Sequence, residues 1–265
     1  MNASTLFKST LLLCALFSLS TGRALADGDR DNDQGRENNV RFKELPSHAQ
    51  LKRVLKSVVD VGGTNNSGFG LNMWATIVNR DGEVAAVAFS GNDRGDQWPG
   101  SRAISAQKAN TANAFSLPGL ALATANLYTA VQPGGSLYGL QHSNPVDTDT
   151  AYRGPSRNYG QQNDPMIGRK IGGVNIFGGG LALYNRDGKL VGAVGVSGDT
   201  SCTDHIIAWK LRKALALDYV PGGVSPTGDD NIVFDPASGW AHPDCGGAAK
   251  STAEALPTTH PISHQ

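Results

Sequence analysis

The chain has 265 residues, 17% of them charged, and its 23 basic residues balance its 23 acidic ones. This charge content is too low for a coiled coil or a charged disordered chain, and no basic excess favours nucleic acid as a partner. The length fits one moderately large domain with appended segments.

The N-terminal residues 1–26 have the pattern of a secretory signal peptide. Lys8 supplies a positive charge, the apolar run LLLCALF follows, and the segment ends in the small-x-small sequence Ala24-Leu25-Ala26. The run is well short of the roughly 20 apolar residues that a membrane span needs. We therefore expect cleavage after Ala26, a periplasmic or secreted protein and no membrane span. The polar segment 27–44 is expected to be disordered.

Two cysteines, Cys202 and Cys245, remain after this cleavage. Disulfides persist in the oxidising compartments that exported proteins occupy. We therefore predict one disulfide between them, and the alternative is two free thiols.

The first expected elements are a helix and a hairpin. Ser47 can cap a helix whose apolar residues, from Leu51 to Val59, recur at helical spacing. Two apolar runs within residues 72–91 then flank Asp81-Gly82, which indicates a hairpin turn in which both residues need positive φ.

Helices are expected over 101–116 and 119–131, and a second hairpin and helix over 181–198 and 203–218. The tetrapeptide Asn-Arg-Asp-Gly occurs in both hairpins, at 79–82 and 185–188. We interpret this as two hairpin–helix units in one sheet, although local turn chemistry alone can produce the same pattern. Hairpins covered by helices predict an α/β sandwich of the α+β kind with an antiparallel sheet.

Two long segments contain few periodic apolar residues. Residues 132–180 lie between the units, and a loop of this length is usually functional. Residues 221–265 are rich in Pro and Gly, so we expect an extended tail, pinned at Cys245 and frayed after about residue 250.

The helix over 101–116 places a lysine and a threonine among apolar residues. Ile104, Lys108, Thr111 and Phe115 fall on one stripe. One interpretation is a lysine that extends past the edge of the core. The other is a polar pair at the wall of an apolar pocket, suited to a ligand that carries carboxylates.

Histidine and arginine side chains provide further candidates. His205 and His142 are each either a ligand contact or a structural residue. In the long loop, Arg153 and Arg157 can bind carboxylates, and Tyr152 and Tyr159 can stack on a flat ring. The alternative for these four residues is a solvated loop.

The glycine-rich run 172–180 matches neither a P-loop nor a dinucleotide-binding fingerprint, because a strand rather than a helix follows it. Such a run allows close approach of a ligand or tight packing against a helix.

Several motifs together resemble the GlcG/HbpS-type haem-binding family, in its secreted subtype. They run in the same order over about residues 45–218 and read NMWATIVNRDGEVAAVAFSGND, SRAISAQKANTANAF, QPGGSLYGLQ and GGVNIFGGGLALYNRDGKLVGAVGVSGDT. The resemblance implies one domain over 45–220 with a profilin-like fold, in which helices flank a five-stranded antiparallel sheet. It also implies self-association into a homo-oligomer.

The resemblance further implies non-covalent binding of haem b, for haem carriage, storage or sensing. Lys108 and Thr111 match the family's helix motif, and Phe177, Gly178 and Gly179 match its Phe-Gly-Gly-Gly turn. The segment Ser197-Gly198-Asp199 also matches. We add His205, His142 and Arg153 as candidate haem contacts, with either histidine as candidate iron ligand.

The chain departs from short family members in a loop insert at about 143–170, in the segment around Cys202 and in the tail 221–265. These departures put any transferred axial ligand in doubt. The absence of a Cys-x-x-Cys-His sequence excludes covalent haem attachment of that type.

Two other functions stay open: an oligomeric accessory subunit, and an accessory to an enzyme of small, glycolate-like metabolites, both without a haem role. No acid–base pair or flavin or nicotinamide site is visible, so we favour binding without catalysis. Haem degradation stays open through the family resemblance.

Overall fold

The computed structural model describes residues 41–264. The expected signal peptide and most of the expected disordered segment 27–44 lie outside the described residues. Every helix among residues 41–264 is too short or too polar to span a lipid bilayer.

The core of the domain is an antiparallel sheet, as expected. Its strands are ordered β2-β1-β4-β3, with bounds β1 Trp74–Asn79, β2 Val84–Phe89, β3 Gly180–Tyr184 and β4 Leu190–Ser197. Across residues 41–264 the sheet has four strands, so the expectation of five is wrong. The chain beside β2 forms only an isolated bridge between Glu83 and Lys170, because Gly168 and Gly172 have positive φ and interrupt an extended segment there.

The repeated tetrapeptide forms the same turn in both hairpins. The side-chain oxygens of Asn79 and Asn185 each accept hydrogen bonds from the backbone N–H groups two and four residues later. Only the glycines, Gly82 at φ 76° and Gly188 at φ 69°, have positive φ. The expectation that the preceding aspartates also have positive φ is therefore wrong, because a bulged turn needs that conformation only at its glycine.

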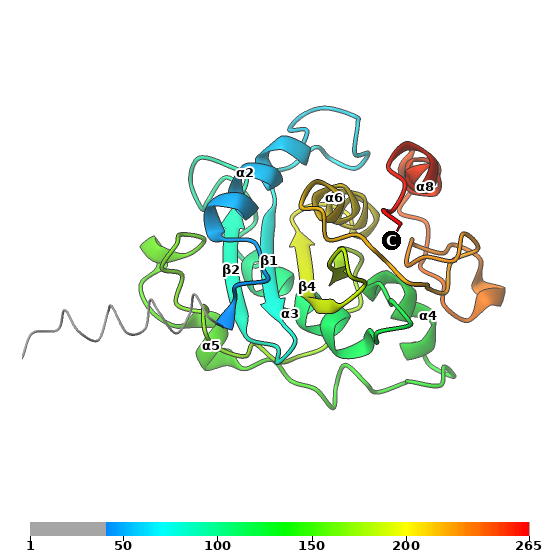
Figure 1. Cartoon of the computed structure of the whole chain (residues 1–265), viewed down its shortest axis with the longest axis horizontal. Helices are drawn as coiled ribbons and strands as arrows, with labels where there is room; N and C mark the ends of the chain where they lie inside the picture. Colours follow the sequence, from blue (N-terminus) through cyan, green and yellow to red (C-terminus); the bar gives the residue numbers. More distant parts are fainter. Residues whose placement is uncertain (1–40, 265) are drawn as a thin grey trace, which may run out of the picture. The chain divides into compact units, whose positions relative to one another are not determined.

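Helices cover both faces of the sheet. Helix α3 (Ser101–Phe115) packs on one face, and α2 (His48–Val58) and α6 (Ser201–Ala214) pack on the other (Figure 1). β1 alternates accordingly, with Trp74 and Val78 toward α3 and Ile77 toward α2 and α6. Because α3 follows the first hairpin and α6 the second, the expectation of two hairpin–helix units in one sheet is confirmed.

The segment after α3 is less helical than expected. Helical structure begins only at η1 (Thr124–Leu127) and continues in α4 (Tyr128–Val131), because residues before it form a turn between Leu117 and Leu120 and a bridge from Ala121 to Gly223. The loop insert contains the short helices α5 (Thr148–Tyr152) and η2 (Ser156–Asn158).

A buried arginine attaches the insert to α3. The Nε of Arg102 donates to Asp164 Oδ2 at 2.9 Å, and its NH1 donates to the carbonyl of Ala151 at 2.7 Å. The ring of Tyr159 stacks on the guanidinium at 3.7 Å. The insert is therefore a packed part of the domain around Arg102.

The tail is ordered where fraying was expected, and that expectation is wrong. It contains η3 (Pro236–Ser238), α7 (Ala249–Glu254) and α8 (Leu256–Thr259). Ala253 and Leu256 are buried in the main core, and the indole of Trp209 donates to the carbonyl of His260 at 2.8 Å. Asp230 is buried in a two-bond ion pair with Arg212, at 2.7 Å for each bond.

The predicted disulfide between Cys202 and Cys245 is confirmed, with the Cα atoms 6.0 Å apart. It joins the first turn of α6 to the tail.

Reduction of this disulfide is expected to lower the free energy of unfolding by about 4 kcal/mol, because the bridge closes a loop across a sequence separation of 43. Urea denaturation with and without a phosphine reductant measures the change. The double variant Cys202→Ser with Cys245→Ser is the control and should not respond to the reductant. An unchanged midpoint for the wild type on complete reduction contradicts this prediction.

Gly195→Ala is expected to lower the free energy of unfolding by about 1–3 kcal/mol. A Cβ at Gly195 would meet the carbonyl of Ser105 and the backbone nitrogen of Ala109, so α3 would have to move away from β4. Chemical denaturation measures the loss. Gly119→Ala, at a position with open space, is the control, and equal effects of the two substitutions would refute the close approach of α3.

Candidate functional site

A pocket of about 220 Å³ lies where β4 ends, beside the first turns of α3 and α6. Its lining includes two conspicuously exposed aromatic side chains, Trp98 at 56% and Phe177 at 49% exposure. Ile104 contributes apolar surface, and Lys108 and Asp204 contribute a charged pair. The pocket therefore combines apolar walls with a polar interior.

The charged pair is a buried contact between two helices. Lys108 Nζ of α3 donates to Asp204 Oδ2 of α6 at 2.6 Å and to the carbonyl of Val196 at 3.0 Å. The Lys108 side chain is 1% exposed and that of Asp204 is 3% exposed. The interpretation of Lys108 as a lysine extending past the core edge is therefore wrong. A charged group this deep needs such partners, because its desolvation costs several kcal/mol.

Burial shifts both groups toward their neutral forms. It raises the pKa of Asp204 to about 6, and the charge and hydrogen bond of Lys108 only partly offset this. It also lowers the pKa of Lys108, against the opposing effect of Asp204. The pocket therefore contains a carboxyl group that titrates above its ordinary range.

Thr111 lies one turn beyond Lys108 and is buried outside the pocket lining. Its Oγ1 donates to the carbonyl of Gln107 at 2.8 Å and accepts from the backbone N–H of Asn175 at 2.9 Å. Thr111 thus positions the segment that leads to Phe177.

The Phe-Gly-Gly-Gly turn packs tightly against both helices. Gly178 donates its N–H to Ser201 Oγ at 2.6 Å. Gly179 has φ 109°, and a Cβ there would meet the carbonyl of Val196, while a Cβ at Gly180 would meet the carbonyl of Lys108. Of the two interpretations of this glycine run, the structure shows tight packing. The packing keeps Phe177 at the pocket mouth.

Asp199 borders the pocket, but its carboxylate already has several backbone partners. It accepts hydrogen bonds from the N–H groups of Phe69, at 2.9 and 3.0 Å, and Leu71, at 3.1 Å. Asp199 therefore orders the loop before β1.

His205 lies in the tail-facing interior and does not line the pocket. Its Nε2 contacts the backbone nitrogen of Ile232 and Asn231 Oδ1, each at 3.2 Å. Burial lowers the pKa of His205 to about 3, so its ring is neutral at ordinary pH.

His142 and Arg153 are exposed on the long loop and do not line the pocket. Arg153 pairs with Asp149 at 2.9 Å. The structure thus brings Lys108 and Phe177 together, with Gly178 and Gly179 adjoining, and places Thr111, His205, His142 and Arg153 elsewhere.

Trp98, Ser201 and Asp204 are pocket residues that the sequence analysis did not assign to a site. For Asp204 the sequence signal was limited to the need for a partner, because a buried lysine on an apolar helix face needs a carboxylate. Trp98 lies in a loop without periodicity, where sequence pattern gives no placement.

A second, larger hollow of about 360 Å³ lies between the start of α3 and the insert. Its lining includes Trp74, Pro99, Tyr152 and Tyr159 and is mainly apolar. The segment from Trp98 to Ser101 separates the two hollows.

The fold is an α+β domain in which helices enclose an antiparallel sheet and leave a pocket at the end of β4. The chain belongs to the HbpS-like family: the model described as "Haem degrading protein HbpS-like" matches residues 47–212.

A curated relative is the uncharacterized 15.0 kDa protein in the dhaT-dhaS intergenic region of Citrobacter freundii. It is 39% identical over 85 residues, which cover 32% of this chain and 41% of the relative. The chain thus spans about two fifths of that relative's length.

Solved structures that are similar to this chain include a PduOC:heme complex and the Klebsiella pneumoniae protein ORFY. Each is 25% identical to this chain, with a TM-score of 0.42. These matches cover 63% of this chain and 89% of PduOC, and 64% of this chain and 90% of ORFY. HbpS is 15% identical with a TM-score of 0.39, over 64% of this chain and 89% of its own.

Asp204→Asn is expected to remove a specific part of the pH dependence of stability. The folded wild type keeps a proton on Asp204 up to about pH 6, whereas the unfolded chain releases it near pH 4. The free energy of unfolding of the wild type should therefore fall as pH rises through this window, relative to the variant.

Chemical denaturation from about pH 4 to 7 measures this difference. Glu254→Gln, at an exposed carboxylate, is the control and should keep the wild-type slope. Parallel curves for the wild type and Asp204→Asn would show that Asp204 does not titrate in this range.

Proposed function

We propose that this chain is an exported haem-binding protein that holds haem b non-covalently at the pocket between Trp98 and Phe177, for carriage, storage or sensing. The observation that carries the proposal is the pair of exposed aromatic side chains flanking this pocket, in a member of the HbpS-like haem-degrading family. Large exposed apolar side chains gathered at a hollow mark a binding surface.

The pocket fits part of the haem ring. Trp98, Phe177 and Ile104 offer apolar surface for a flat macrocycle. Its volume of about 220 Å³ is below the roughly 300–1,000 Å³ typical of sites that enclose a ligand. Haem would therefore insert one edge and leave the rest of its ring outside the pocket.

A second copy of the chain would cover the part of the haem ring that lies outside the pocket. Homo-oligomerisation through the Trp98 and Phe177 face would bury both the aromatic side chains and the protruding ring. We therefore include self-association in the proposal.

The pocket fits an edge of the ring but presents no free iron ligand among its described lining residues. Among the described lining residues, Lys108 is the one nitrogen donor of the lysine or histidine type. Its amine already donates hydrogen bonds to Asp204 and to the carbonyl of Val196. We therefore assign the described residues to contacts with the ring, and no catalytic step to haem.

Export is supported by the N-terminal sequence pattern and by the disulfide, because disulfides persist in oxidising compartments. An exported protein can bind haem either as cargo for transport or as a signal.

Titration of residues 27–265 with haemin is expected to give a saturable Soret band. Trp98→Ala and Phe177→Ala should each weaken binding about 10-fold, because burying such a side chain contributes at least about 1.5 kcal/mol. Tyr138→Ala is the matched control, since Tyr138 is an aromatic residue of similar exposure, at 63%, but lies outside the pocket.

A non-saturating trace would overturn the haem proposal and leave the accessory functions. Saturable binding that neither Trp98→Ala nor Phe177→Ala weakens would move the haem site away from this pocket.

A further inference from the structure

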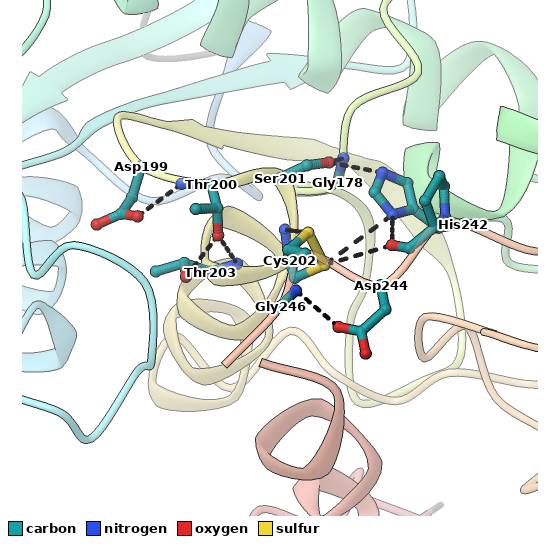
Figure 2. Close-up of a disulfide and its surroundings, with 11 residues drawn as sticks. Gly178, Asp199, Thr200, Ser201, Cys202, Thr203, His242, Asp244 and Gly246 are labelled. Carbon is teal, nitrogen blue, oxygen red and sulfur yellow. Dashed lines mark hydrogen bonds between the residues drawn. A yellow bond between two sulfur atoms is a disulfide. The ribbon is translucent and has the colours of Figure 1, made fainter. Parts of the chain in front are cut away.

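Three side chains of types that commonly bind metals lie together at the first turn of α6. The ligand atoms of Cys202, His242 and Cys245 all lie within 4.8 Å of one another. Figure 2 shows the disulfide of Cys202 beside the ring of His242. Cys202 and His242 are buried and Cys245 is half-buried, so the cluster is shielded but reachable beside Cys245. In the oxidised chain the two sulfurs form the disulfide.

The spacing suits a tetrahedral ion once the sulfurs are free. Zn²⁺ with Zn–S of about 2.3 Å and Zn–N of about 2.0 Å places nitrogen and sulfur roughly 3.5 Å apart and the two sulfurs roughly 3.8 Å apart. Cys202 Sγ already lies 4.0 Å from His242 Nδ1. The Cα atoms of the cysteines are 6.0 Å apart, so side-chain rotation supplies the remaining separation of the sulfurs.

The cluster's position does not depend on the disulfide alone. The backbone N–H of His242 donates to the carbonyl of Val233 at 2.7 Å, and the ring packs 5.2 Å from that of Tyr128. Thr129 Oγ1 donates to the carbonyl of Ala241 at 2.7 Å. These contacts keep the imidazole beside α6 when the sulfur–sulfur bond is open.

The hydrogen bonds of His242 define its tautomer. Nδ1 lies 2.7 Å from the carbonyl of Pro243, which only accepts, so Nδ1 carries the proton. Nε2 therefore accepts from Ser201 Oγ at 2.8 Å. When Nδ1 binds a metal, the proton is carried by Nε2, which then donates to Ser201 Oγ, the outer-sphere arrangement typical of metal-bound histidine.

We propose that reduction of the Cys202–Cys245 disulfide creates a zinc site formed by Cys202, Cys245 and His242, with water as the fourth ligand. A small dithiol supplies two electrons and two protons, the sulfur–sulfur bond breaks, and the dithiol becomes its own disulfide. Zn²⁺ then displaces the protons of the two thiols. Two sulfurs, one imidazole nitrogen and water complete a tetrahedral set.

This site is continuous with the pocket described above. Ser201 lines the pocket and accepts the N–H of Gly178, which is adjacent to Phe177 (Figure 2). Metal binding reverses the direction of the Ser201–His242 hydrogen bond and frees the hydroxyl proton of Ser201. The redox state of the cysteines is thereby coupled to a pocket residue, whatever ligand the pocket holds.

The test is an anaerobic titration of the reduced, full mature chain with Zn²⁺, in which calorimetry measures the heat of binding. One Zn²⁺ per chain is expected after reduction and none at this site in the oxidised chain. Co²⁺ in place of Zn²⁺ should give thiolate-to-cobalt charge-transfer absorption. Reduced chain that binds no more zinc than oxidised chain overturns the proposal.

Variants separate this site from adventitious binding. His242→Ala preserves both cysteines and removes a direct ligand, so it should weaken zinc binding more than about 100-fold. Ser201→Ala removes only an outer-sphere partner and should weaken zinc binding about 10- to 100-fold. His142→Ala, at an exposed histidine, is the matched control and should bind as the wild type does. Equal zinc affinity of His242→Ala and the wild type overturns the assignment.

Circular dichroism covers the case in which reduction unfolds the chain. Adding zinc should then return the reduced wild type to its folded spectrum, whereas reduced His242→Ala should stay unfolded with zinc. Failure of zinc to do so also overturns the proposal.

Discussion

The buried ion pair between Lys108 and Asp204 ties α3 to the first turn of α6 past the end of β4. Both charged side chains are almost fully buried, so each needs the other, and removing one partner of such a pair typically costs about 3–5 kcal/mol. The contact therefore fixes where α6 begins relative to α3. The pocket and the Phe-Gly-Gly-Gly turn depend on that placement, because both lie directly against these two helices.

The same constraint recurs at two other places. In the described part of the chain, Arg102 binds Asp164 of the insert and Arg212 binds Asp230 of the tail, and all four side chains are buried. Each buried cation on α3 or α6 thus attaches a segment distant from it in sequence. This explains why an insert and a tail with few apolar residues pack as ordered parts of the domain.

The sequence predicted what depends on local chemistry. The repeated Asn-Arg-Asp-Gly identified both hairpins, because the asparagine side chain and the glycine conformation act within one turn. Helical periodicity identified α2, α3 and α6, and the two cysteines that remain after the expected signal peptide left one disulfide to form. These features need no knowledge of distant partners.

What the sequence could not predict depends on long-range contacts. Lys108 on an apolar stripe implied a polar partner, but nothing local identified Asp204. The ordered tail depends on Asp230 reaching Arg212, and Trp98 becomes a pocket residue only because the loop before α3 lies beside Phe177. His205 had suitable chemistry for a ligand, but the tail covers it.

Hydrogen exchange with and without haemin tests most directly whether haem occupies the pocket beside Lys108 and Asp204. Haem bound in this pocket should slow exchange in peptides from Trp98 to Lys108 and from Phe177 to Asp204, and should leave the insert around Tyr152 unchanged. Protection confined to the insert, or a haemin-bound chain with no protection at either pocket segment, would contradict it.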